Sequence, residues 1–177
     1  MAGNPDNASI WADADVYVGD TDATDPADID TAFGATWDLV GLLNGDAGFT
    51  DAIEEDVQDH YGWGVHVRTS RRNFKLTRGF TVIEDNDVTR ELLWPGSTAA
   101  KLYQPRPQRI KIAFETRDGA KKLRYISAFE AEVGWDGDIN WSEAELTAFP
   151  LIATIYPDVS DTNALGGALL WNRQVSA

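Results

Sequence analysis

The most regular alternation of apolar and polar residues lies between positions 109 and 127. Alternate residues are apolar on either side of Asp118-Gly119, and these are Ile110, Ile112, Phe114, Leu123 and Tyr125. Successive side chains of a strand point to opposite faces, so the pattern predicts two strands that each bury one face. Asp-Gly is a favourable two-residue hairpin turn, and a turn there places Phe114 opposite Leu123.

Five more segments have the hydrophobic pattern of strands. They are residues 10–18, 36–43, 65–70, 74–84 and 148–156. The first alternates strictly, whereas the last is apolar on both faces. A strand of the latter kind lies in the centre of two layers or has its second face covered by another subunit. We expect 148–156 to be the last strand of the fold.

One short segment, residues 86–94, predicts a helix. Asp85 or Asn86 can cap its first turn by accepting hydrogen bonds from backbone N–H groups, and Pro95-Gly96 ends it. The helix residues expected to pack on the sheet are Val88, Leu92 and Leu93. The sequence therefore predicts a mostly β fold, either a β-sandwich or a partly closed barrel, with one short α-helix.

The segment 47–59 fits neither the helical nor the strand period, and it holds five acidic residues that would be costly to bury. We interpret it as an extended arm or long hairpin that stands away from the core, with an exposed loop as the alternative. The following Gly62-Trp63-Gly64 is interpreted as a flexible joint that carries one large aromatic residue.

We expect one β domain over residues 1–157 and a C-terminal extension over residues 158–177. The extension holds apolar residues that are unfavourable to leave in water, namely Leu165, Leu169, Leu170 and Trp171. It is therefore expected to dock on its own domain or on a neighbouring subunit, and the sequence leaves both open.

The net charge of −14 is distributed in three consecutive blocks. Residues 1–67 hold fifteen acidic residues and no Lys or Arg, residues 68–124 hold fourteen basic and six acidic residues, and residues 125–177 hold eight acidic residues and one Arg. Such blocks either neutralise one another within the fold or let the acidic surface of one copy meet the basic surface of the next. The excess of acid disfavours a protein that grips DNA, but it suits a channel through which DNA slides.

No motif in the sequence points to catalysis, so we expect no enzyme activity, no cofactor and no metal. The chain has no cysteine, and its two histidines lack the spacing of a zinc site. Asp136, Asp138 and Asn140 have the spacing of the first half of a calcium loop, but Trp141 and Thr147 stand where that loop needs Gly and Glu. We interpret them as an ordinary turn, with a weak cation site as the alternative. We also expect no membrane span and no secretion signal.

The order of motifs between Trp37 and Trp94 resembles the first half of a major tail tube protein of long-tailed bacteriophages (siphoviruses), especially those of high-GC Gram-positive hosts. In that family a Trp-led strand, an acidic-glycine turn, a charged extended segment and a strand leading into a short helix follow one another. The matching residues are Trp37, Asp38, Leu39, Gly41, Gly48, Thr69, Arg71, Phe80 and Glu84. The resemblance implies a tail-tube-like β fold and a structural, non-enzymatic role.

The resemblance further implies six-subunit rings that stack into the hollow, non-contractile tail tube through which phage DNA is delivered. The partners would be further copies of the chain, the tape measure protein in the lumen, and the tail terminator and tip proteins, with DNA passing without specific binding. The chain would be made in the host bacterial cytoplasm and would end in the tail of the virion. Residues 41–45 and the C-terminal tail depart from the family pattern.

In this family a long loop in the region of residues 47–59 contacts the neighbouring ring, so we expect the acidic arm to meet basic strands of the next ring. The acidic residues expected in that contact are Asp51, Glu54, Glu55 and Asp56. The basic residues expected opposite them are Arg68, Arg71, Arg72 and Lys75.

Two other functions stay open from the sequence. A monomeric β-sandwich module that binds carbohydrate or protein would use a strip of exposed tryptophans, for which Trp63, Trp135 and Trp141 are candidates. A relative of the tail tube protein that forms a single ring, such as a tail terminator or tip protein, would share the same motifs.

Overall fold

The computed structural model describes residues 9–176. Regular structure among these residues consists of eleven strands and one helix, α1 (Asp87–Leu93). The strands are β1 (Asp13–Gly19), β2 (Trp37–Leu39), β3 (Thr50–Gly62), β4 (Val65–Val82), β5 (Arg109–Asp118), β6 (Lys121–Ser127), β7 (Ala131–Trp135), β8 (Phe149–Ile155), β9 (Asp158–Thr162), β10 (Ala168–Leu169) and β11 (Trp171–Val175). The prediction of a mostly β chain with one short helix is confirmed.

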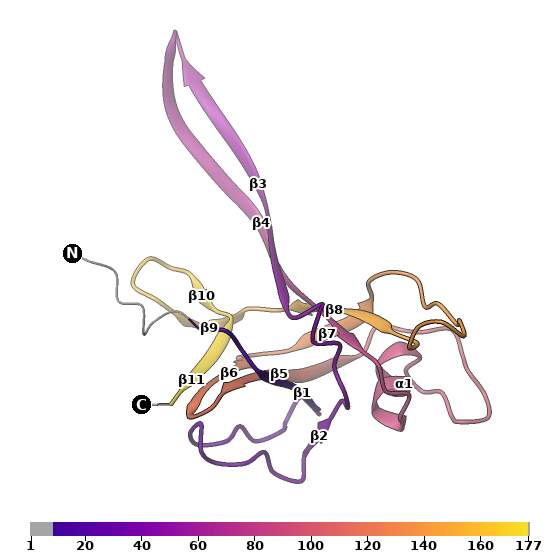
Figure 1. Ribbon diagram of the computed structural model, residues 1–177. Coiled ribbons are helices and arrows are strands. Elements are labelled where there is room, and N and C mark those ends of the chain that lie inside the picture. Colours follow the sequence, from indigo (N-terminus) through magenta and orange to yellow (C-terminus); the bar gives the residue numbers. More distant parts are fainter. Residues whose placement is uncertain (1–8, 177) are drawn as a thin grey trace.

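Nine of the strands form one antiparallel sheet that branches at β5. Its main path runs β11-β6-β5-β7-β8-β4-β3, and β1, which carries β2, pairs with the other edge of β5. β5 is the branch point because residues 113–118 pair with β6, whereas Arg109 and Ile110 pair with β7. The sheet therefore bends, and Figure 1 shows β1, β5 and β6 below β7 and β8.

The core lies between the two parts of the bent sheet. Phe80 of β4 and Phe114 of β5 meet edge to face with ring centroids 5.5 Å apart. The other large buried members are Val16, Val18, Val40, Leu76, Val82, Leu92, Leu93, Ile110, Ile112, Phe149, Leu151 and Ile155. Burial of such apolar surface, at about 25 cal/mol per Å², is the main term that stabilises a fold of this kind.

The sheet is not closed into a barrel. The chain after β2 runs toward β4, where Leu43 forms a single bridge with Val82 and the Asn44 N–H donates to Thr81 O at 2.8 Å. The mostly β fold is therefore one large, bent and open antiparallel sheet, and the choice between the predicted sandwich and partly closed barrel stays a prediction.

The predicted short helix is present as α1. Asn86 is its N-cap, because the Asn86 side chain accepts a hydrogen bond from the Thr89 N–H at 2.8 Å. The same side chain donates to Val40 O at 2.9 Å, which ties the start of the helix to the chain after β2. The helix residues that contact the core are Val88, Leu92 and Leu93.

The predicted strands 65–70 and 74–84 are one continuous strand, the 18-residue β4. The polar sequence between them does not end the strand, because Asn73 adopts a positive φ of 55° and the register against β3 shifts there. Asn tolerates the left-handed region better than most residues, so a bulge keeps the ladder intact. Gly62-Trp63-Gly64, predicted as a flexible joint, is the turn between β3 and β4.

The hairpin of β5 and β6 is confirmed, but its turn lies one residue later than predicted. Gly119-Ala120 forms the turn, Gly119 has a φ of 59°, and Phe114 pairs with Tyr125 rather than with Leu123. A type II′ turn needs its positive φ at the first turn position, which Gly119 occupies only in this register. The partner of each β5 residue on β6 shifts by two positions relative to the prediction. Because side chains alternate with a period of two, the same side chains stay on the buried face.

The segment 148–156 forms β8, but it is not the last strand. β9 and β10 form a separate two-stranded hairpin, and β11 pairs with β6 at the edge of the large sheet. Trp171 of β11 packs against the core, whereas Leu165 is exposed in the turn between β9 and β10. Part of the C-terminal segment thus lies on the sheet of its own chain, and the division at residue 157 stays a prediction.

Candidate functional site: a projecting arm and the pocket at its root

A two-stranded arm projects from the body of the molecule (Figure 1). We define the arm as residues 50–79, in which β3 pairs with the first part of β4. β4 gains β8 as a second neighbour only from Leu76 onward, so within the described chain residues 54–75 pair only with each other. The 13 residues of β3 at about 3.3 Å each make the arm about 40 Å long. The predicted long hairpin is therefore confirmed, and the exposed-loop alternative is wrong.

Acidic residues of β3 face basic residues of β4 across the arm. Glu55 accepts a hydrogen bond from Arg71 Nη1 at 2.7 Å, and a Glu54 carboxylate oxygen lies 3.7 Å from Lys75 Nζ. Ion pairs this exposed contribute little to stability, because water and salt screen them. Some of the acidic and basic residues that we expected to pair between copies therefore pair within one arm.

The remaining charged residues of the arm also lie on facing strands. Arg68 and Arg72 are in register with His60 and Asp56, and Asp56 accepts a hydrogen bond from the Asn73 side chain at 2.7 Å. The arm is neutral overall, with acids Asp51, Glu54, Glu55, Asp56 and Asp59 and bases Arg68, Arg71, Arg72, Lys75 and Arg78. Contact of these residues with a neighbouring copy stays a prediction.

Arg78 anchors the root of the arm, and the sequence analysis missed it. Its side chain is buried, and it donates to both carboxylate oxygens of Asp51 at 2.6 and 2.7 Å. Its guanidinium carbon lies 4.9 Å from the ring centroid of Phe114 and 4.8 Å from those of Tyr125 and Trp171. A paired guanidinium among three rings is a favourable place for a buried charge. The alternation that buries positions 76, 80 and 82 already places position 78 on the same face.

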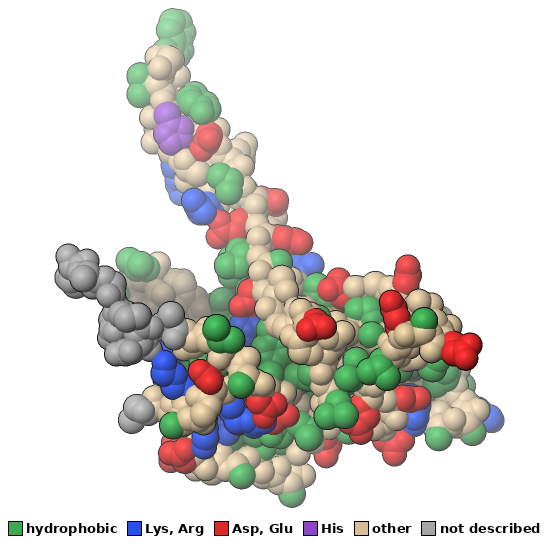
Figure 2. All heavy atoms as spheres, in the orientation of Figure 1, with side chains coloured by type: hydrophobic (Ala, Val, Ile, Leu, Met, Phe, Trp, Pro, Cys, Tyr) green, Lys and Arg blue, Asp and Glu red, His purple; other side chains and the backbone are tan. Residues whose placement is uncertain are grey.

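The tip of the arm, which we define as residues 61–67, is apolar and exposed. The exposed fractions are 71% for Tyr61, 105% for Trp63, 64% for Val65 and 69% for Val67. Gly64 has a φ of 73°, which suits the second position of a tight turn and leaves Trp63 at the end of the arm. Figure 2 shows hydrophobic side chains at the end of the arm and mixed acidic and basic side chains over its lower half.

The two histidines lie on the arm near the tip, and both form hydrogen bonds with neighbours on the arm. His60 Nε2 lies 3.1 Å from Ser70 Oγ. His66 Nε2 lies 3.3 Å from a carboxylate oxygen of Asp59, which also accepts a hydrogen bond from Thr69 Oγ1 at 2.6 Å. These contacts link β3 to β4 near the tip and brace the hairpin.

A pocket of about 630 Å³ opens at the root of the arm, and we call it the root pocket. Its apolar lining comes from segments far apart in the sequence and includes Trp11, Leu39, Leu42, Phe49, Leu123 and Tyr125. Its charged lining consists of Asp13, Asp15, Asp51, Glu84 and Arg78. The pocket therefore combines an apolar surface with a mainly acidic rim, a combination that suits an apolar side chain from a basic or neutral partner.

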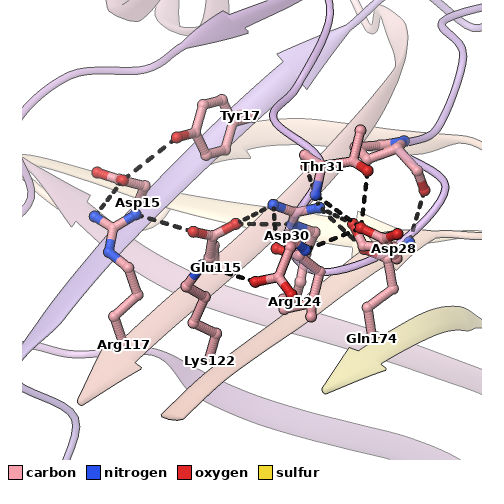
Figure 3. Close-up of polar contacts among 12 residues, drawn as sticks. Asp15, Tyr17, Asp28, Asp30, Thr31, Glu115, Arg117, Lys122, Arg124 and Gln174 are labelled. Carbon is pink, nitrogen blue, oxygen red and sulfur yellow. Dashed lines mark hydrogen bonds and ion pairs between the residues drawn. The ribbon is translucent and has the colours of Figure 1, made fainter. Parts of the chain in front are cut away.

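A separate charged cluster lies between β1, β5 and β6 (Figure 3). Glu115 and Arg124 are 6% and 3% exposed, and Arg124 Nε donates to Glu115 at 2.7 Å. Arg117 holds the other carboxylate oxygen of Glu115 at 2.9 Å and Asp15 at 2.5 Å. Arg124 also donates to three backbone oxygens in residues 28–31. Because guanidinium groups hold these carboxylates, we assign the cluster a structural role rather than general acid–base catalysis.

The cluster shifts the pKa values of several groups. A hydrogen bond from Arg117 lowers the pKa of Asp13. Burial acts to lower the pKa of Arg117, but its hydrogen bonds to Asp13 and Asp15 outweigh burial, and the pKa is raised. Burial raises the pKa of Tyr17, and the negative charges of Asp15 and Glu115 raise it further.

The raised pKa of Tyr17 predicts a loss of stability in alkali. The folded protein holds the phenol proton more tightly than the unfolded chain does, so this contribution is complete below the ordinary pKa of 10.0 and is lost as the pH rises through the higher folded pKa. We expect the melting temperature of the wild type to fall more steeply above about pH 10 than that of Tyr17→Phe. Thermal melts between about pH 8 and about pH 11 measure this, with the exposed Tyr103→Phe as control. Superimposable profiles for wild type and Tyr17→Phe would contradict it.

The candidate calcium-loop residues lie in the link between β7 and β8. Asp136, the first of them, donates its backbone N–H to Pro150 O at 3.0 Å, which continues the pairing of β7 with β8 beyond Trp135. Asp138 and Asn140 follow it in the same link. Within residues 9–176, no three His, Cys, Asp or Glu side chains gather in a way that could hold a metal ion. The choice between an ordinary turn and a weak cation site at Asp136, Asp138 and Asn140 stays a prediction.

Residues that carry the resemblance to tail tube proteins hold specific structural positions. Trp37 is buried, and its indole N–H donates to Thr24 O at 2.9 Å. Gly41 has a φ of 115°, and a Cβ there would lie 2.8 Å from a carboxylate oxygen of Glu84. That same oxygen accepts the Leu42 N–H at 3.0 Å. The motif residues of this region thus shape the chain between β2 and the root of the arm.

A scan against protein-family models found no match, and a search of curated proteins found no relative. In the part of the chain that the structure describes, no helix is long and apolar enough to cross a membrane. The case for a function therefore rests on the arm, its root pocket and the sheet from which they emerge.

Proposed function

We propose that the chain is a structural virion protein, the subunit of the tail tube of a long-tailed phage. Copies would form six-subunit rings, and the rings would stack into a hollow tube through which DNA passes. The tape measure, tail terminator and tip proteins would be its other partners, and the virion tail its location. The fold of the body would then be the tail-tube-like one that the motifs between Trp37 and Trp94 imply.

The observation that carries this proposal is the exposed arm. An isolated two-stranded hairpin is marginally stable in water, and the apolar residues exposed together at its tip form a patch of the kind that marks an interaction surface. Further apolar residues of the arm, Ile53, Val57 and Phe74, are also exposed. Contact with another subunit would bury this surface and support the hairpin.

The open sheet supports the assembly of rings. β3 and β11 end the main path of the sheet, and β2 ends its branch, so each leaves one edge unpaired within the described chain. Edges of this kind invite pairing with other strands, and closure into a continuous barrel around a lumen would remove them. The net charge of −14 would favour passage of DNA without binding.

The binding-module alternative has less support, because the three candidate tryptophans do not form one strip. Trp63 lies at the tip of the arm, whereas the Trp135 indole donates to Leu93 O at 2.9 Å and packs edge to face on Trp94. Trp141 packs against Phe149, with ring centroids 6.1 Å apart. A single-ring tail terminator or tip protein would share the arm, and unlimited stacking distinguishes the tube subunit from it.

Charge reversal on the arm tests the proposed role. We expect Glu54→Lys/Glu55→Lys to fold and to lose association by at least about tenfold, because the reversed charges repel Arg71 and Lys75 of their own arm and the basic residues proposed to meet them on the next copy. Sedimentation velocity over a range of concentrations measures this, with Glu143→Lys/Glu145→Lys, exposed acids outside the arm, as the matched control. Unchanged association of the arm variant would show that the charged residues of the arm do not take part in the contact between copies.

A further inference from the structure

We propose that the tip of the arm of one copy docks in the root pocket of the next copy, so that the axial repeat of the assembly equals the length of the arm. This inference rests on the proposed function and names the surface that receives the arm. It follows from the chemistry of the tip, the chemistry of the pocket and the distance between them.

The tip has the composition of an interface anchor. Trp and Tyr dominate the residues that carry binding energy at protein interfaces, and they act when they fill a pocket in the partner. Trp63 lies at the very end of the arm, between Tyr61 and Val65, and all three are largely exposed. A surface of this kind needs a concave apolar partner rather than a flat polar one.

The root pocket is such a partner. Its volume of about 630 Å³ lies in the range of pockets that bury a large ligand group. Leu39 and Leu42 line it and are themselves well exposed in the single chain, so they have apolar surface left to cover. The arm of the same copy cannot fill the pocket, because a stiff hairpin of about 40 Å carries its tip away from its own root.

Charge complementarity favours the same pairing. No acidic residue lies between His60 and Arg68, so the end of the arm is neutral to basic. The pocket is lined by four acidic residues and one Arg, and Arg117 outside the lining offsets only part of that excess. Opposite charges at the rim fix the orientation of an interface more than they add affinity.

The length of the arm determines the axial repeat of the assembly. The pocket includes Asp51 and Arg78, where the arm begins, so a tip seated there displaces each copy from the next by one arm length, about 40 Å. A compact body of the remaining residues has a diameter of roughly 40 Å, so bodies stacked at this repeat also touch. A contact between two different surfaces of identical subunits builds an open stack unless the rotation between copies closes a ring, and the shift of one arm length per copy keeps this stack open.

Cross-linking tests the docking directly, because the chain has no cysteine of its own. We expect Val65→Cys/Leu42→Cys, with one thiol in the tip and one in the pocket, to give a ladder of covalent oligomers on oxidation. Each single variant can form at most a dimer and is the matched control. We also expect Trp63→Ala, and separately Leu39→Gln/Leu42→Gln, to weaken association by at least about tenfold in sedimentation velocity. Leu165→Ala removes an equally exposed apolar side chain elsewhere and is expected to change nothing.

The outcomes separate this inference from the proposed function. Tubes or rings that form normally with Trp63→Ala, without a ladder from the double-cysteine variant, overturn the docking and leave the tube subunit standing. A loss of association from Trp63→Ala alone, with the pocket variant unaffected, places the tip on another surface and also overturns it. A wild type that stays monomeric at every concentration overturns both.

Discussion

Removing the arm abolishes assembly and leaves the body folded. Residues 55–74 contribute no buried side chain, and Glu54 and Lys75 face each other across the two strands. An Asn-Gly turn in place of residues 55–74 therefore closes a short hairpin at that pair without disturbing the core. We expect the shortened chain to melt within a few degrees of the wild type, roughly the effect of a surface change, and to remain monomeric at all concentrations.

Circular dichroism melts and sedimentation velocity on the same samples measure both parts of this prediction. The Glu143→Lys/Glu145→Lys variant, which keeps the arm, is expected to assemble like the wild type. Assembly of the armless chain would show that the body alone carries the contacts. An unfolded armless chain would show that the arm is part of the core, against its exposure in the structure.

Breaking the buried ion pair between Arg124 and Glu115 costs far more stability than replacing the exposed residues 55–74 of the arm. Arg124→Met leaves the buried Glu115 with Arg117 alone and removes the donor of three backbone oxygens in residues 28–31. Loss of one partner of a buried pair typically costs about 3–5 kcal/mol, because a charge stays in the interior without full compensation. For a chain of this size that lowers the melting temperature by roughly 6–20 °C.

Two comparisons make this prediction specific. Arg173→Met removes an exposed Arg from β11 and is expected to change stability by no more than about 0.5 kcal/mol. Arg124→Met/Glu115→Leu replaces the pair by apolar groups and is expected to recover part of the loss. Urea unfolding of the three variants measures the differences. Equal stability of Arg124→Met and Arg173→Met would show that the cluster does not hold β1, β5 and β6 together.

Local signals were sufficient for the helix and for the existence of the arm. Asn86 caps α1 as its position before an apolar repeat predicts, because capping depends only on residues within one turn. The acids of 47–59 predict exposure, because burial of unpaired charge is unfavourable wherever the segment lies. Both the helix cap and the exposure of the acidic segment depend on residues that are close in sequence, so both could be predicted from the sequence.

Features that depend on distant partners could not be predicted in the same way. The polar residues around Asn73 suggest a break in β4, but a bulge against β3 carries the strand through them. The predicted turn at Asp118-Gly119 has a good local sequence, and only pairing over the whole β5–β6 hairpin shows that Gly119-Ala120 forms the turn.

The candidate site shows the same division. Acidic and basic residues were predicted on facing surfaces, and the structure places them on facing strands of one arm, where Glu55 meets Arg71. The root pocket could not be predicted from the sequence, because Trp11, Leu42 and Leu123 come from distant segments that only the bend of the sheet brings together. The burial of Arg78 could have been predicted, because the alternation of β4 places it on the buried face.

Negative-stain electron microscopy of the purified wild-type protein, at low and high concentration, tests whether the chain assembles into a tube. Hollow tubes or stacked rings are expected at high concentration, with an axial repeat of about 40 Å set by the arm. Isolated particles of monomer size at every concentration would contradict the tube assembly and would favour a monomeric binding module.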